Sequence, residues 1–200
     1  MDTPQTPDAT PARGSKGCLY AIFVSAAIVA VLFVAIKSAR QQAAADMERR
    51  QQERREKAVQ TVLDGRTDVS VSDGELLTML ADNPQCANSI TSIHFFMADV
   101  GGPEFARLDE FPSLTDVGFY DCSNADSLMP AASTLPQLES LFFEVTLLSD
   151  DSLELLAKFQ RLKKVHFEQV MDDKTIAKLN ELLPNVNVET PFPASQEPTR

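Results

Sequence analysis

The two histidines of the chain, His94 and His166, are the first candidates for chemistry, because imidazole can bind a metal or act as a general base. If they lie three parallel strands apart, at about 4.8 Å per strand, about 14 Å separates them. Zinc–nitrogen bonds are about 2 Å long, so the two rings cannot share one metal ion. The sequence therefore favours two surface histidines over a metal centre.

Two acidic pairs, Asp150–Asp151 and Asp172–Asp173, are the next candidates. Each pair precedes a segment with helical periodicity, where carboxylates cap backbone N–H groups and face the positive end of the helix dipole. Neither pair has the spacing of a calcium loop. The sequence contains no glycine-rich phosphate loop, nucleophile elbow or metalloprotease helix. We therefore expect no enzyme activity, no cofactor and no metal site.

Composition excludes several further classes. The 200 residues hold 18 basic and 29 acidic groups, a net charge of −11, which argues against a nucleic-acid partner. Apolar residues make up 44% of the chain, which excludes disorder throughout. The three cysteines, Cys18, Cys86 and Cys122, are too few for a disulfide-dense scaffold. Residues 1–64 have a net charge of +2, whereas residues 65–200 have a net charge of −13, so the chain has two unlike parts.

A repeat of 24 residues dominates the second part. Its four blocks are Ser89–Pro112, Ser113–Pro136, Gln137–Gln160 and Arg161–Pro184. Apolar residues recur at four positions of each block, which chance does not produce. Position 2 holds Ile90, Leu114, Leu138 and Leu162; position 5 holds Ile93, Val117, Leu141 and Val165; position 7 holds Phe95, Phe119, Phe143 and Phe167; position 23 holds Phe111, Leu135, Phe159 and Leu183. A short strand followed by a helical segment, stacked four times, predicts a solenoid with a parallel sheet along one side.

The opening LxxLxF of each block resembles the leucine-rich repeat family, with Phe in place of the third Leu. The third block, TLLSDDSLELLAKFQRL, is similar to bacterial and ribonuclease-inhibitor-like members. The resemblance implies an α/β fold with its sheet on the concave side. The family's ladder position holds Ala98, Cys122, Thr146 and Val170, so two of the four lack a polar group for backbone pairing. Gly101, Gly102, Pro103 and Pro130 predict irregular convex segments in the first two blocks.

The flanks of the repeats suggest caps. Val69 and Val71 alternate like a strand and precede a helix start, so residues 65–88 are predicted as an N-terminal half-repeat. Residues 89–184 form the four repeats. Residues 185–200 are predicted as a closing strand with Val186 and Val188, followed by a disordered tail.

The first part of the chain predicts an anchor and a stalk. Residues 1–17 read as a disordered tail. Residues 18–36 are free of charge and would span about 28 Å as a helix. This length favours a transmembrane helix that crosses the lipid bilayer once, over a buried soluble helix or a cleaved signal peptide. The basic residues after this segment favour a cytoplasmic repeat domain, against the alternative of export. Residues 37–64 predict a charged helical stalk, either a single spacer helix or a coiled coil that makes a homo-oligomer.

The concave face carries the candidate binding site. Positions 6 and 8 of neighbouring strands place aromatic side chains together and acidic side chains at their margin: Phe96, Tyr120, Phe142, His94, His166, Glu144 and Glu168. Such a patch is typical of a protein-binding anchor. The alternative is that position 8 turns inward and packs on the core. Gly118 is expected to open a gap beside Phe142 that a partner side chain could enter.

These observations predict a membrane-anchored leucine-rich-repeat protein that binds an unidentified protein through its concave face. The alternative is a structural protein that oligomerises through residues 37–64, with the repeats only extending it.

Overall fold

The computed structural model describes residues 16–169 and 171–191, and it describes side chains from residue 32 onward. The chain divides into two compact units, residues 1–52 and residues 53–200. Of the tail predicted as disordered at residues 1–17, residues 1–15 lie outside the described residues, whereas Lys16 and Gly17 begin a helix. Residues 192–200 of the predicted C-terminal tail also lie outside the described residues.

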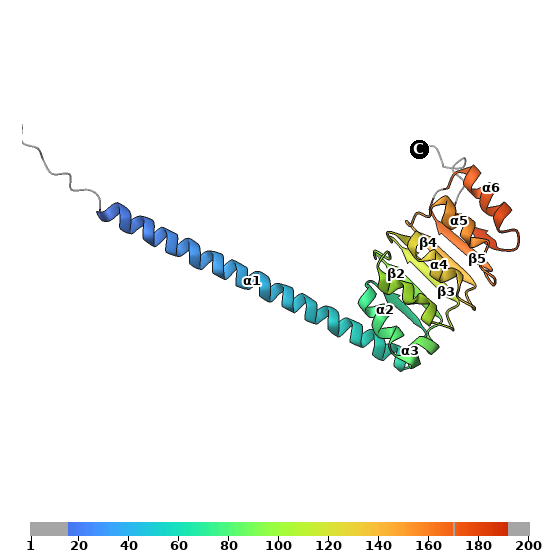
Figure 1. The fold of residues 1–200 in the computed structure, drawn as a ribbon, viewed down its shortest axis with the longest axis horizontal. Helices are drawn as coiled ribbons and strands as arrows, with labels where there is room; N and C mark the ends of the chain where they lie inside the picture. Colours follow the sequence, from blue (N-terminus) through green and yellow to red (C-terminus); the bar gives the residue numbers. More distant parts are fainter. Residues whose placement is uncertain (1–15, 170, 192–200) are drawn as a thin grey trace, which may run out of the picture. The chain divides into compact units, whose positions relative to one another are not determined.

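A single long helix, α1 (Lys16–Leu63), occupies the described part of the first unit (Figure 1). From residue 37 it contains no Gly or Pro and is rich in Ala, Gln, Glu and Arg, all strong helix formers. The helix covers residues 37–63 of the predicted stalk. Every side chain from residue 32 to residue 54 is exposed, and Arg49 pairs with Asp46 one turn earlier, 2.8 Å away.

The membrane span predicted for residues 18–36 is corrected by the structure. No helix is both long and apolar enough to cross a bilayer in the part of the chain that was searched, which is the described part. The predictions of bilayer contact through residues 18–36, single-pass membrane localisation and a cytoplasmic repeat domain are therefore not supported. The side chains of residues 16–31 lie outside the described residues.

A parallel sheet of six strands forms the centre of the second unit, in the order β1-β2-β3-β4-β5-β6 (Figure 1). The prediction of an α/β fold with a parallel sheet is therefore confirmed. The strands are β1 (Asp68–Val71), β2 (Ser92–Phe96), β3 (Asp116–Tyr120), β4 (Ser140–Glu144), β5 (Lys164–Glu168) and β6 (Asn187–Glu189).

Pairing follows the sequence period. Ser92 pairs with Asp116, Asp116 with Ser140, and Ser140 with Lys164, so equivalent block positions are neighbours across the sheet. The segment 65–88 has more than a half-repeat. Its strand β1 pairs with β2 at the same offset, with Asp68 opposite Ser92, and two helices follow it.

Helical segments connect the strands. They are α2 (Gly74–Ala81), α3 (Pro84–Ser89), η1 (Pro103–Glu110), η2 (Ala125–Ser127), α4 (Met129–Ser133), α5 (Asp150–Leu156) and α6 (Asp173–Leu182). The units that contain Pro103 and Pro130 have 3-10 segments and one short α-helix, whereas the last two repeats have longer α-helices. The irregularity expected from these glycines and prolines is thus observed.

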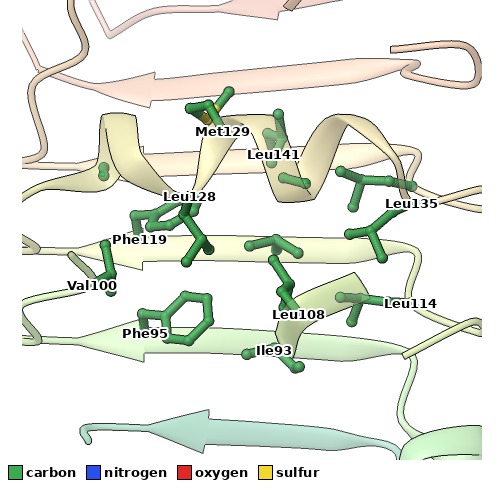
Figure 2. Packing of buried hydrophobic residues seen from close by; sticks show 14 of the residues in the cluster. Ile93, Phe95, Val100, Leu108, Leu114, Phe119, Leu128, Met129, Leu135 and Leu141 are labelled. Atoms are coloured by element: carbon green, nitrogen blue, oxygen red, sulfur yellow. The ribbon is translucent and has the colours of Figure 1, made fainter. Parts of the chain in front are cut away.

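One face of the sheet packs against these helical segments. Along each of the strands β2, β4 and β5, buried residues alternate with more exposed ones, as expected for a sheet covered on one side. Figure 2 shows the covered side, where Leu128, Met129 and Leu135 lie over Phe119 and its neighbours.

The position-7 phenylalanines stack in this core. Ring centroids are 5.5 Å apart between Phe95 and Phe119, 5.1 Å between Phe119 and Phe143, and 5.2 Å between Phe143 and Phe167. All four side chains are fully buried. The 24-residue offset puts one ring above the next, so a single block position supplies a continuous aromatic column through the core.

The end of α1 belongs to the second unit. Val62 is buried, and Ala58, Val59 and Leu63 pack against the same core. The largely buried Arg55 side chain joins this turn to the segment 65–88 through ion pairs with Asp73 and Glu75. The last turns of the helix therefore cover the end of the core beside the segment 65–88.

The ladder position carries hydrogen bonds where its side chain allows them. The Thr146 hydroxyl is fully buried, accepts from the backbone N–H of Cys122 (3.2 Å) and donates to the carbonyl of Glu144 (2.9 Å). The Cys122 thiol lies 3.4 Å from the carbonyl of Phe95. Ala98 has no polar side chain, and Val170 lies outside the described residues. This position therefore joins the turns of neighbouring units.

We predict that Thr146→Val lowers the free energy of unfolding by about 1–3 kcal/mol, because the buried N–H of Cys122 loses its acceptor while side-chain volume is kept. Thr134→Val makes the same chemical change at an exposed hydroxyl that bonds the Ala131 carbonyl, and we expect less than about 0.5 kcal/mol there. Urea unfolding followed by circular dichroism measures both. Equal losses for the two variants would contradict a structural role of the ladder.

Candidate functional site

An aromatic row crosses the open face of the sheet. It consists of Phe96, Tyr120, Phe142 and His166, one residue from each of the strands β2 to β5. Ring centroids are 4.4 Å apart between Phe96 and Tyr120, 4.8 Å between Tyr120 and Phe142, and 4.7 Å between Phe142 and His166. All three pairs are stacked. The structure therefore brings together four of the seven predicted site residues in one continuous arrangement.

The row stays on the open face throughout. Phe96 is 36% exposed, and Tyr120, Phe142 and His166 are half-buried. The alternative interpretation, in which position 8 turns inward onto the core, does not describe Phe96 or Tyr120. The core on the other face is filled by the position-5 and position-7 residues instead.

Gly118 allows the row to pass from block position 8 on β2 and β3 to block position 6 on β4 and β5. Phe96 and Tyr120 occupy position 8, whereas Phe142 and His166 occupy position 6. A Cβ atom at residue 118 would lie 2.7 Å from Tyr120 Cε2 and 2.7 Å from His94 Nδ1, closer than real contacts allow. Tyr120 therefore leans over Gly118 to reach Phe142. The gap expected beside Phe142 is not an entry for a partner, because Tyr120 and His94 occupy the space above Gly118.

His94 supports the row from β2. Its ring lies 5.6 Å from the Tyr120 ring, and its Nε2 lies 2.8 Å from the Ser92 hydroxyl. Nδ1 is buried and has no hydrogen-bond partner in the described structure. His94 and His166 lie on β2 and β5 with two strands between them, as expected. Among the described residues, no three His, Cys, Asp or Glu side chains are grouped so that they could hold a metal ion.

Glu189 ends the row on the β6 side. Its carboxylate lies 3.0 Å from His166 Nδ1 and 2.8 Å from Lys164 Nζ. Hydrogen bonds from Lys164 and His166 lower the pKa of Glu189 to about 2. The carboxylate therefore stays ionised at neutral pH and fixes the orientation of the His166 ring.

Glu144 and Glu168 form the acidic margin. They are register partners on β4 and β5, and they follow Tyr120 at the same block position. Burial raises the pKa of the Tyr120 phenol, and the negative charges of Glu144 and Glu168 raise it further. The two carboxylates therefore act electrostatically on the Tyr120 hydroxyl, which places all seven predicted site residues within one connected surface.

The sequence did not single out the apolar residues at the carboxyl edge of the sheet. Met97 and Val145 are 78% and 64% exposed, and Leu147 is 80% exposed. Met97, Asp121 and Val145 all have left-handed backbone, with φ of 47°, 51° and 49°. This conformation is unfavourable for a β-branched residue such as Val145. Met97, Asp121 and Val145 share position 9 of the repeat, and this shared position is the signal from which the turn could have been found.

Left-handed backbone at position 9 has a structural use. The N–H of Met97 donates to the carbonyl of Tyr120 (2.8 Å), and the N–H of Asp121 donates to the carbonyl of Glu144 (2.9 Å). The left-handed turn thus continues the interstrand hydrogen bonds one residue past β2 and β3. The side chains at position 9, Met97, Asp121 and Val145, are exposed.

The two acidic pairs lie at the starts of helices α5 and α6. Asp172 caps α6 by accepting from the N–H of Thr175 at 2.6 Å, and Asp173 lies in the first turn. Ser149 caps α5, with Asp150 and Asp151 in its first turn. Capping is therefore confirmed for Asp172 alone, whereas Asp150, Asp151 and Asp173 lie in the first turns, near the positive end of the helix dipole.

The described cysteines have no catalytic surroundings. Cys86 and Cys122 are free and buried. Burial raises the pKa of both thiols, which disfavours the reactive thiolate. Cys18 lies in the segment whose side chains are not described.

Comparison with known proteins gave no match: no protein-family model, curated protein or solved structure matches this chain. The resemblance to leucine-rich repeats therefore still rests on the residues that carry it.

We predict that Gly118→Ala separates Tyr120 from Phe142 and lowers the free energy of unfolding by about 1–3 kcal/mol, because the added methyl group overlaps two rings. Ser140→Thr, which adds a methyl group on the same face of the next strand, is the matched control, with an expected change below about 1 kcal/mol. Ring-current shifts of the Phe142 protons report the stacking. Unchanged shifts in a folded Gly118→Ala protein would contradict the role assigned to this glycine.

We predict that the Tyr120 phenol titrates above the ordinary pKa of 10.0. The chain has two tyrosines, so the measurement uses Tyr20→Phe and follows tyrosinate absorbance with pH. Combining Glu144→Gln with Glu168→Gln lowers this pKa without restoring the ordinary value, since burial is the larger cause. Asp109→Asn with Glu181→Gln, two exposed acids on the helical segments, removes the same charge and should leave the pKa unchanged. Equal shifts in both double variants would contradict a local effect.

Proposed function

We propose that this chain is a protein-binding module of the leucine-rich-repeat type, which binds its partner through the open face of the parallel sheet. The aromatic row is the observation that carries the proposal. Tyr and Phe side chains are enriched in protein interfaces because they bury large areas with few rotatable bonds. The row exposes such side chains without any helical segment covering them.

Preorganisation supports the same function. The stacked rings are held by neighbouring strands on one side and by each other along the row. Ordering side chains on binding costs about 0.5–1.5 kcal/mol for each rotamer-rich group, and rings that are already ordered avoid most of that cost. The proposal includes no catalytic step and no cofactor.

A structural role through α1 is the second candidate. The helix is exposed at every described position from residue 32 to residue 54 and carries Leu32, Phe33, Val34, Ile36 and Met47 on its surface. Association with other helices would cover these exposed apolar side chains. Sedimentation equilibrium of the full chain separates the candidates, because this role requires a stable oligomer that Phe142→Ala leaves intact.

The binding proposal is tested by site-specific photo-crosslinking of the full chain in its native cells. We predict that a benzophenone side chain at residue 97, beside the row, forms a discrete adduct that Phe142→Ala reduces about tenfold, as loss of an aromatic anchor would. The same group at residue 181, exposed on α6, is the control and should not form that adduct.

Circular dichroism first establishes that Phe142→Ala is folded. Phe142→Leu, which keeps most of the volume, replaces it if it is not. Identical adducts from residues 97 and 181, or an adduct that neither substitution weakens, would contradict binding through the open face.

A further inference from the structure

Two carboxylates on the open face have no counter-ion. Glu144 and Glu168 lie opposite each other in the β4–β5 register, where side chains are about 5 Å apart at Cβ. Neither side chain forms an ion pair or a hydrogen bond with another side chain in the described part of the chain. Like charges directly opposite on neighbouring strands destabilise a sheet. The fold therefore tolerates an unfavourable contact at this point.

The other acidic groups of the open face have an ion-pair or a hydrogen-bond partner. Asp68 pairs with Arg66 at 2.7 Å, and Glu189 pairs with Lys164 at 2.8 Å. Asp116 accepts from the Thr115 hydroxyl at 2.6 Å. Lys164 is the one Lys or Arg on this face of the six described strands, and Glu189 already engages it. Glu144 and Glu168 are thus the adjacent carboxylates of the face that have neither an ion pair nor a side-chain hydrogen bond among the described residues.

This charge borders the aromatic row. Tyr120 occupies the same block position on β3 as Glu144 and Glu168 do on β4 and β5, and it is close enough for both charges to act on its phenol. The exposed Val145 follows Glu144 directly. A ligand group at this place meets apolar surface on one side and two carboxylates on the other.

We propose that the partner is a protein segment that presents an arginine side chain between Glu144 and Glu168, with the arginine's methylene groups against Tyr120 and Phe142. This inference rests on the proposed function and adds the chemistry of the partner. Arginine satisfies both requirements because its guanidinium forms paired hydrogen bonds with carboxylates and stacks on aromatic rings. Its charge also removes the repulsion between the two glutamates. The net charge of −13 on residues 65–200 attracts a basic segment from a distance.

The test uses a displayed library of random 12-residue peptides, selected on the full chain and counter-selected on its Phe142→Ala variant. Peptides that survive are synthesised, and their affinities are measured by fluorescence anisotropy. We expect the selected peptides to contain arginine. We also expect Glu144→Gln with Glu168→Gln to weaken them about tenfold or more, as loss of a charge-paired contact does. Replacing the peptide arginine by citrulline, which keeps the shape but removes the charge, should weaken them equally.

The control variant is Asp109→Asn with Glu181→Gln, which removes the same two negative charges away from the face and should change affinity less than about twofold. Peptides that depend on Phe142 but lack basic residues, or that ignore the glutamine substitutions, would overturn the arginine proposal and leave the binding face intact. Equal weakening by both double variants would also overturn it, because attraction would then be general. If no peptide depends on Phe142, the binding function itself fails.

Discussion

The register between neighbouring strands is the constraint on which the rest of the structure depends. Each residue of β1 to β4 faces the residue 24 positions later, so whatever a block position holds is repeated across the sheet. A slip of one residue would move every buried Val and Phe to the solvent side. The register is therefore what converts a linear period into a phenylalanine column on one face and an aromatic row on the other. The two series of stacked rings are consequences of one pairing rule, applied to odd and even positions.

Much of the fold follows from this rule and could be read from the sequence. The period locates the strands, and alternation assigns positions 5 and 7 to the core and positions 4, 6 and 8 to the open face. The seven proposed contact residues were identified on that basis alone. Gly101, Gly102 and Pro103 likewise indicated where regular helices are absent. These inferences succeeded because they depend on spacing, and a parallel sheet in constant register preserves spacing.

The inferences that failed depend on what side chains do after spacing has placed them. Position 6 of β3 holds glycine, which indicates an empty place, but Tyr120 fills that place by leaning from position 8. The left-handed backbone at Val145 could not be foreseen, because β-branched residues disfavour it. Residues 18–36 were interpreted from hydropathy alone, and the described side chains give no helix able to cross a bilayer. The last turns of α1 were assigned to a stalk, although they pack on the core of the second unit. A 24-residue period does not indicate which segment packs against the N-terminal end of the repeats.

The open face combines several features that a sheet selected for stability alone would avoid. Aromatic rings remain partly in water, apolar side chains at and near left-handed backbone are exposed, and Glu144 and Glu168 lie opposite each other with no counter-ion in the part of the chain that the structure describes. The opposite face has none of these: its rings are buried, and its hydroxyl and thiol groups are bonded to backbone carbonyls. Both faces are built on the same strands in the same register, so the contrast does not come from the fold. A binding partner that covers the rings and supplies positive charge would relieve the first and third of these unfavourable features together. The free energy that the isolated chain loses there is then available for recognition, because it is recovered only in the complex.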